Sequence, residues 1–145
     1  MDAWILYLLY TLVLSTRERY TESMDWKYIA GFFDGEGTIA THHKGYRVRI
    51  TISQTNLEVL ERIRDFAKVG SVVEITKRKK HWKDAWVYYI SKQADIVKFL
   101  KGIKPSLVLK KGLARKSIAD LEIRLRERKH ADRRLKQRIK KAKKL

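Results

Sequence analysis

The sequence predicts an α+β fold in which an antiparallel four-stranded sheet carries helices on one face. Apolar residues recur at helical spacing in some segments and at alternate positions in others. Two pairs of short alternating segments are each joined by a polar turn, and a helical segment separates the pairs. The expected elements are a helix over residues 25–34, strands over 38–43 and 46–54, a helix over 57–68, strands over 72–76 and 86–90, a helix over 94–103 and a last long helix from Pro105.

The ends of the first elements carry local signals. Asp25 or Ser23 can cap the first helix, and residues 44–45 supply a Lys-Gly turn for the first hairpin. Asn56 can cap the second helix, and Gly70 lies just past its end, where glycine often terminates a helix. The face of the second helix that we expect in the core carries Leu57, Leu60, Ile63 and either Arg64 or Ala67.

The second hairpin and the last two helices follow the same logic. The segment KRKKHWKDA joins two short alternating stretches as the loop of a hairpin. Pro105 is expected at the first position of the last helix, where its missing N–H group costs nothing. Ala114, Ile118, Leu121 and Leu125 then recur at helical spacing, which predicts that one stripe of this helix is buried.

Two segments flank the expected core, which spans residues 24–123. Residues 3–14 are apolar except for Thr11, but the run has about half of the roughly 20 residues that a membrane helix needs, and no basic stretch of a secretory signal precedes it. We therefore expect an intracellular protein with no membrane role, in which residues 1–23 add a helix buried against the domain or a partner chain. Residues 124–145 are expected to form a basic helical tail.

The net charge indicates the partner. The 34 Lys and Arg against 16 Asp and Glu leave +18, more than solubility requires, so nucleic acid is the expected ligand. Residues 124–145 account for +10 and are either a solvated helix end or an arm that follows phosphates. The absence of cysteine excludes disulfides, thiolate metal sites and thiol nucleophiles, so a metal must be held by oxygen or imidazole.

The first hairpin has a polar face suited to DNA. Because side chains alternate along a strand, Val48, Ile50 and Ile52 point to the helices and the residues between them point away. A two-stranded ribbon fits the major groove, where Arg reads guanine edges and Thr meets thymine methyl groups; the alternative is an ordinary solvated sheet face. The expected DNA-binding residues are Thr38, Ala40, His42, Lys44, Arg47, Arg49 and Thr51, extended by Lys77, Arg78, Lys79, Lys80 and Lys83 of the second hairpin.

Two carboxylates stand where negative charge is least favoured. Asp34 and Glu36, each followed by glycine, come at the C-terminal end of the first helix, where the helix dipole repels them. A divalent cation would resolve this conflict, and Mg²⁺ prefers carboxylate and carbonyl oxygens. The alternative is that Asp34 only ends the helix and Glu36 is a surface residue in a glycine-rich turn.

The nine residues IAGFFDGEG, Ile29 to Gly37, resemble the LAGLIDADG motif of intron- and intein-encoded homing endonucleases. The expected order of helices and strands over residues 25–125 is similar to that of this family. The resemblance implies a LAGLIDADG-type αββαββα core. It also implies a site-specific DNA endonuclease that uses Mg²⁺ to hydrolyse phosphodiesters across the minor groove, leaving short 3′ overhangs.

The resemblance also implies the site residues. Glu36 matches the metal-binding acid of the family, and the carbonyl of Gly35 matches a further metal ligand. Gln54 matches a polar residue that orders solvent at the active site. Lys110 matches a basic residue near the scissile phosphate, which orients water or stabilises developing charge.

A single copy of the motif gives half an active site, so the resemblance implies a homodimer on a near-palindromic DNA target. The motif helix is expected to form the seam between the copies at Ala30 and Gly31, with Asp34 in a structural role there. Two other functions stay open at this point. One is an RNA maturase that assists splicing of its host intron, and the other is a DNA-binding protein of the same fold without catalysis.

Overall fold

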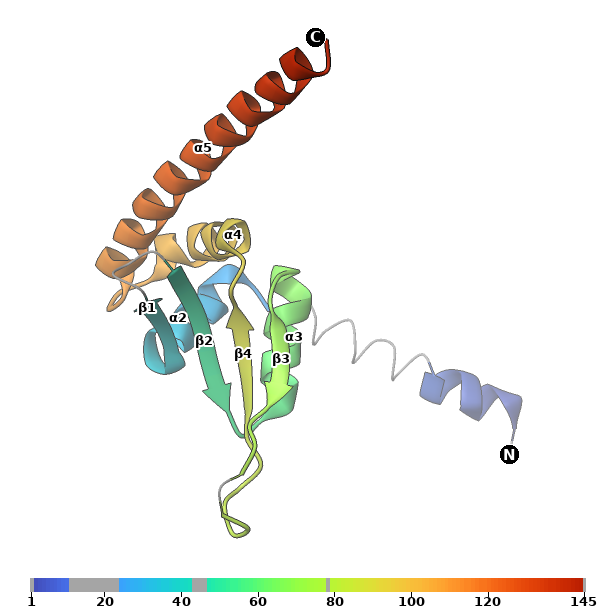
Figure 1. Ribbon diagram of the computed structural model, residues 1–145. Helices are drawn as coiled ribbons and strands as arrows, with labels where there is room; N and C mark the ends of the chain where they lie inside the picture. Colours follow the sequence, from blue (N-terminus) through green and yellow to red (C-terminus); the bar gives the residue numbers. More distant parts are fainter. Residues whose placement is uncertain (1, 11–23, 43–46, 78, 145) are drawn as a thin grey trace.

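The computed structural model describes residues 2–10, 24–42, 47–77 and 79–144. The order of its helices and strands confirms the expected α+β class (Figure 1). The elements of the domain are α2 (Trp26–Glu36), β1 (Gly37–His42), β2 (Arg47–Gln54), α3 (Leu57–Ala67), β3 (Ser71–Glu74), β4 (Trp86–Ile90), α4 (Gln93–Ile103), the short 3₁₀ helix η1 (Lys104–Ser106) and α5 (Lys111–Ala142).

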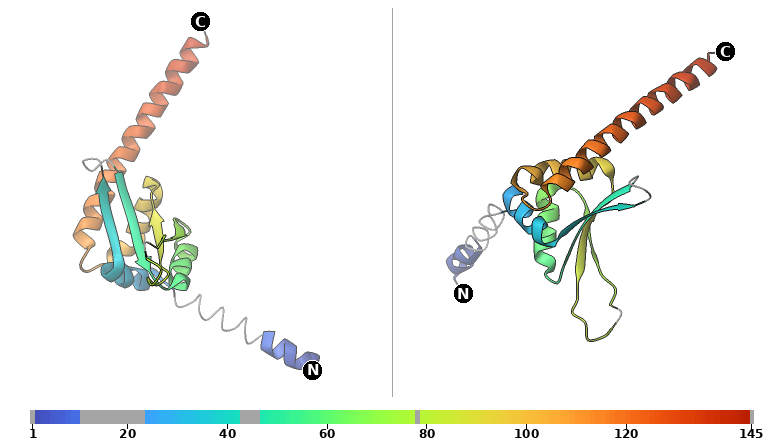
Figure 2. Two further views of the ribbon diagram at one scale, coloured as in Figure 1. Left: turned by 60° about the horizontal axis from the view of Figure 1, so that its bottom comes forward. Right: turned by 90° about the vertical axis from the view of Figure 1, so that its left-hand side faces the viewer.

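The four strands form one antiparallel sheet in the order β1-β2-β4-β3, so the two hairpins meet along β2 and β4. Ile50 of β2 lies opposite Ile39 of β1 on one side and Ile90 of β4 on the other. Helices α2, α3 and α4 contact the sheet from the same side (Figure 2). Among the described residues no helix covers the other face, as the sequence predicted.

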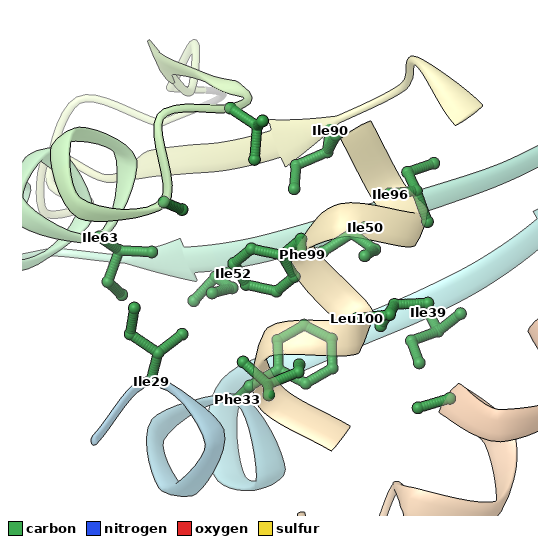
Figure 3. Packing of buried hydrophobic residues seen from close by; sticks show 14 of the residues in the cluster. Ile29, Phe33, Ile39, Ile50, Ile52, Ile63, Ile90, Ile96, Phe99 and Leu100 are labelled. Atoms are coloured by element: carbon green, nitrogen blue, oxygen red, sulfur yellow. The ribbon is translucent and has the colours of Figure 1, made fainter. Parts of the chain in front are cut away.

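The core lies between the sheet and these helices (Figure 3). Phe99 of α4 is fully buried and packs edge-on against Phe33 of α2, with ring centroids 5.8 Å apart. Tyr88 of β4 is also fully buried; its hydroxyl donates to the carbonyl of Val69 at 2.8 Å, and burial raises the pKa of Tyr88. Each large apolar side chain buried here contributes about 1.5–3 kcal/mol, so this layer dominates the stability of the domain.

Side-chain caps fix the starts of α2 and α3. The carboxylate of Asp25 accepts a hydrogen bond from the N–H group of Tyr28 at 2.7 Å. The side-chain oxygen of Asn56 accepts one from the N–H group of Val59 at 3.1 Å. Both caps were expected, and each contributes about 1 kcal/mol to its helix. In α3 the buried fourth position of the core stripe is Ala67.

The last helix begins later than the sequence predicted. Pro105 lies in η1, and α5 starts at Lys111 after an intervening loop, residues 107–110. The expected core stripe is confirmed, because Ala114, Ile118 and Leu121 are buried. Beyond them α5 runs without a break to residue 142, so the basic tail is the continuation of a core helix and projects from the domain (Figure 1).

The amino-terminal segment forms a short helix over residues 3–10. The large apolar side chains from Trp4 to Tyr10 are between 48% and 78% exposed, so the expected burial against the domain is not observed. Burial against a partner chain stays a prediction. Residues 11–23 and 43–46, which include the expected Lys-Gly turn, lie outside the described residues. No helix within the described ranges is long and apolar enough to cross a bilayer.

Candidate functional site

The C-terminal end of α2 meets the loop at residues 107–110. The carboxylate of Asp34 accepts hydrogen bonds from the N–H groups of Val108, at 2.6 Å, and Lys110, at 3.0 Å. The ammonium group of Lys110 donates to the carbonyl oxygens of Phe33, at 3.0 Å, and Asp34. Backbone N–H groups therefore stabilise the negative charge of Asp34. The ammonium group of Lys110 offsets the partial negative charge at the helix end.

These contacts also set the ionisation of Asp34. Burial alone would raise the pKa of the Asp34 carboxyl. The N–H groups of Val108, Lys110 and Leu109 and the positive charge of Lys110 outweigh it, so the pKa lies below its ordinary value. Asp34 is thus a structural residue within its own chain; its expected place in a dimer interface stays a prediction.

Glu36 has different surroundings, although it is only two residues further on. Its side chain is exposed and has no hydrogen bond or ion pair in the described part of the chain. Its oxygens and the carbonyl of Gly35 are of the kind that Mg²⁺ prefers. The described residues hold no cluster of three or more His, Cys, Asp or Glu side chains. The described residues therefore supply part of a metal site, and further oxygens would have to come from beyond them.

Gln54 lies at the same end of the sheet. β1 starts at Gly37, opposite Ile52, so the end of β2 lies beside the end of α2. Gln54 is half-buried and, by alternation, on the same face of the sheet as Ile52. The three expected catalytic residues, Glu36, Gln54 and Lys110, thus gather around one helix end.

Two glycines lie about one turn apart on the outer side of α2. Gly31 and Gly35 are exposed, and a Cβ atom added at either would have no neighbour within 4 Å. At Gly37, in contrast, an added Cβ would lie 2.1 Å from the ring of Phe33. Ala30 is 0% exposed in the core of its own chain, so it cannot touch a second copy and the expectation for it is wrong.

The first hairpin presents the predicted polar face. Arg47 and Arg49 are exposed, whereas Val48 and Ile50 between and after them are buried. Two Arg side chains therefore stand on the open face of the sheet. The pairs that share this face are Thr38 with Thr51, Ala40 with Arg49 and His42 with Arg47.

The centre of the open face holds two residues that the sequence analysis missed. Because β4 lies next to β2, Tyr89 is paired with Thr51, and Val87 with Ser53. Alternation against the buried Tyr88 would have placed both on the open face. Their position beside the Arg residues depends on the strand order, which no local pattern carries.

The basic residues of the second hairpin lie on the loop between β3 and β4, which projects beyond the sheet (Figure 1). Lys77 forms an ion pair with Asp84, so part of the charge is neutralised. Lys44 and Arg78 lie outside the described residues. The exposed cations described on this loop are Lys77, Lys79, Lys80 and Lys83.

Comparison with protein families agrees with the motif. A family model for the LAGLIDADG-like domain matches residues 23–104, more than half of the chain. This chain belongs to the LAGLIDADG family. The matched part of this LAGLIDADG protein contains α2 and the whole sheet. Comparison with curated protein sequences finds no significant match.

Solved structures have the same LAGLIDADG fold. The homing endonuclease I-TnaI is 23% identical, with a TM-score of 0.57 over 72% of this chain and 76% of that chain. I-CvuI in complex with its target is 22% identical, with a TM-score of 0.54 over 67% of this chain. The match spans 65% of the I-CvuI chain, less than two thirds of its length. For the meganuclease I-CpaMI bound to uncleaved DNA, at 19% identity and a TM-score of 0.53, the match spans 38% of that chain.

Proposed function

We propose that this chain is a metal-dependent homing endonuclease, which acts as a homodimer and hydrolyses one phosphodiester in each strand of a near-palindromic DNA site. The observation that carries the proposal is Glu36, an exposed carboxylate at a helix end with no partner among the described residues. The helix dipole disfavours an acid there. At Asp34, which has a structural role, two backbone N–H groups stabilise the charged carboxylate. Glu36 has no such contacts within the described residues.

Each residue around this helix end has a separate role in the proposed reaction. Glu36 and the carbonyl of Gly35 would hold Mg²⁺ together with oxygens of a second copy and of the DNA. Bound Mg²⁺ supplies an activated water and stabilises charge on the leaving 3′ oxygen. The amide of Gln54 can orient water, since it both donates and accepts. The ammonium group of Lys110 is fixed by two carbonyl oxygens, which keeps a positive charge near the reacting phosphate.

The open sheet face is the proposed DNA-binding surface. Exposed Arg side chains donate in a fork that matches the guanine edge in the major groove. The net charge of +18 adds affinity that does not depend on sequence. The structures of I-CvuI with its target and of I-CpaMI on uncleaved DNA have this fold in complex with DNA, which supports the assignment.

The exposed glycines of α2 support the homodimer. A glycine inside a helix costs about 1 kcal/mol relative to alanine, yet no contact in the described chain requires Gly31 or Gly35. Close approach of a second helix gives both a purpose. Val108 and Leu109 in the adjoining loop are 81% and 79% exposed, and a partner at this helix end would cover apolar surface.

The catalytic proposal is tested with Glu36→Gln. Wild-type protein should cut plasmid DNA that carries its host-gene junction, and only with Mg²⁺. The variant should bind that DNA within a few fold of wild type without cutting it, while Glu74→Gln, which changes another exposed acid, should cut normally. Full cleavage by Glu36→Gln would remove Glu36 from the mechanism. Wild-type binding without cleavage indicates a non-catalytic binder, and preference for the intron RNA indicates a maturase.

The dimer is tested with Gly31→Leu. The larger side chain should force the two helices apart at a cost of about 1–3 kcal/mol and separate the paired Glu36 carboxylates, so that assembly and cleavage both fall. Ala119→Leu adds the same side chain to an exposed position of α5 and should leave both unchanged. Sedimentation reports the assembly and a nicking assay the chemistry. A wild-type protein that is monomeric both free and on DNA, yet cuts both strands, would contradict the half-site argument.

A further inference from the structure

A groove lies where the sheet ends and α5 leaves the domain. It has a volume of about 690 Å³ and is bounded by the outer ends of β1 and β2, by the turn from β4 into α4, and by α5. In Figure 1 the start of β2 lies close to α4 and α5. Five of the ten lining residues are basic and none is acidic; the basic ones are His42, Arg47, Arg49, Lys92 and Arg128.

The lining determines the class of ligand. Pockets for small organic molecules are lined mainly by apolar and aromatic side chains, whereas here only Val48, Ala94 and Leu125 are apolar. Several permanent positive charges without a lining carboxylate attract an anion. Arg donates in a planar fork that matches two oxygens of a phosphate group. Phosphate is therefore the anion that this groove suits best.

The position of the groove identifies which phosphate. Arg47 and Arg49 belong both to the groove and to the open sheet face. A DNA strand that lies on that face and passes its outer end therefore meets Lys92 and Arg128 next. Both side chains are exposed, and neither forms an ion pair within the described residues. Figure 2 shows that α5 continues past the ends of β1 and β2 and projects away from the domain.

We propose that this groove binds the phosphate backbone of the DNA held on the sheet, with Lys92 and Arg128 as backbone-positioning residues outside the sheet. The inference rests on the proposed DNA-binding function. Phosphate contacts fix the register of a protein on the duplex but carry no sequence information. Lys92 and Arg128 therefore contribute affinity that falls with salt, whereas Arg47 and Arg49 contribute base preference as well.

The double variant Lys92→Gln/Arg128→Gln tests the groove. Lys98→Gln/Arg134→Gln is its matched control, because these exposed residues lie on α4, which Lys92 precedes, and on α5, which carries Arg128; the control loses the same charge but its residues do not line the groove. Binding of each full-length protein to a labelled DNA duplex of unrelated sequence is measured by fluorescence anisotropy over a range of salt. Affinity falls as salt rises, and each lost phosphate contact makes the slope of log affinity against log salt shallower by about 0.9. The slope of the groove variant should therefore be shallower than that of wild type by about 2 per protomer, and the slope of the control should be unchanged.

The possible results separate the groove from the function on which it rests. Equal slopes in the two variants, or a groove variant with the wild-type slope, would overturn the groove proposal alone. A change seen only with duplex RNA of the same sequence would also overturn it, because the groove would then serve another nucleic acid. If wild-type protein shows no salt-dependent binding to the DNA duplex, the proposed function fails first. Thermal unfolding should be unchanged in both variants, since all four side chains are exposed.

Discussion

Asp34 and Glu36 stand on opposite sides of one helix end, and their surroundings differ accordingly. Asp34 is half-buried and accepts two backbone hydrogen bonds from the loop at residues 107–110. Glu36 is exposed and has no partner in the described part of the chain. An α-helix turns by about 100° per residue, so residues two apart point roughly in opposite directions. The spacing of the two acids thus separates a structural carboxylate from one that a ligand can use.

The comparison shows how an unpaired acid can be held in place without contacts of its own. The hydrogen bonds of Asp34 tie the last turn of α2 to residues just before α5. The ammonium group of Lys110 adds two contacts to the same turn. Glu36 stands on that turn, so its backbone is fixed by its neighbours while its side-chain oxygens stay accessible. In the proposed function both carboxylates are needed, Asp34 to fix the helix end and Glu36 for the chemistry.

Replacing each acid by alanine should give the largest difference between the two positions in the free energy of unfolding. Asp34→Ala leaves two N–H groups without their charged acceptor, and we expect a loss of about 2–3 kcal/mol in the free energy of unfolding. Glu36→Ala changes an exposed side chain and should stay within about 0.5 kcal/mol of wild type. Denaturant unfolding of the three proteins in one buffer measures the difference. Equal losses in the two variants would show that Glu36 has structural contacts after all.

Replacing Lys110 should have a smaller effect on stability, and it tests the contacts at the same helix end. Lys110→Met removes the two hydrogen bonds to the carbonyl oxygens of Phe33 and Asp34, and should cost about 1 kcal/mol of stability. Lys111→Met is the control, because the ammonium group of Lys111 has a single contact at 3.5 Å with the carbonyl of Pro105 and should cost less than about 0.5 kcal/mol. If both variants have wild-type stability while Lys110→Met alone loses cleavage, Lys110 acts only on the reacting phosphate.

The fold could be predicted largely from the sequence because its signals are local. The strands of the two hairpins alternate cleanly, and the caps Asp25 and Asn56 stand directly before their helices. The start of the last helix was misplaced because Pro105 suits the first turn of a 3₁₀ helix as well as that of an α-helix. The order of the strands, which brings Tyr89 beside Thr51, has no local signal at all.

The site was less predictable, because its contacts join distant parts of the chain. The motif indicates Glu36, but the hydrogen bond from Val108 to Asp34 spans 74 residues. The burial of Ala30, which we expected at the dimer seam, could have been predicted from the sequence. Ile29 and Phe33 lie one turn apart on the buried side of α2, and Ala30 lies beside them on the same side. That spacing leaves Gly31 to face outward, as the structure has it.

The smallest expected effect is on the pH dependence of stability, and it concerns Asp34 alone. In the folded chain the pKa of Asp34 lies below its ordinary value of 3.8, because the N–H groups and Lys110 outweigh burial. In the unfolded chain the carboxyl titrates near that ordinary value. The folded state therefore binds fewer protons, and the stabilisation is present above about pH 4 and is lost as the pH falls through the lower, folded pKa.

Asp34→Asn lacks this titration, so the stability gap between wild type and variant should narrow as the pH falls below about pH 4. It should not close completely, because the second oxygen of a protonated carboxyl can still accept a hydrogen bond from Val108 or Lys110, whereas the amide nitrogen of Asn only donates. Urea unfolding of both proteins at stepwise lower pH measures the gap. A gap that stays constant through the acid range would mean that the charge of Asp34 adds nothing to its hydrogen bonds. The contrast with Glu36 would then rest on geometry alone.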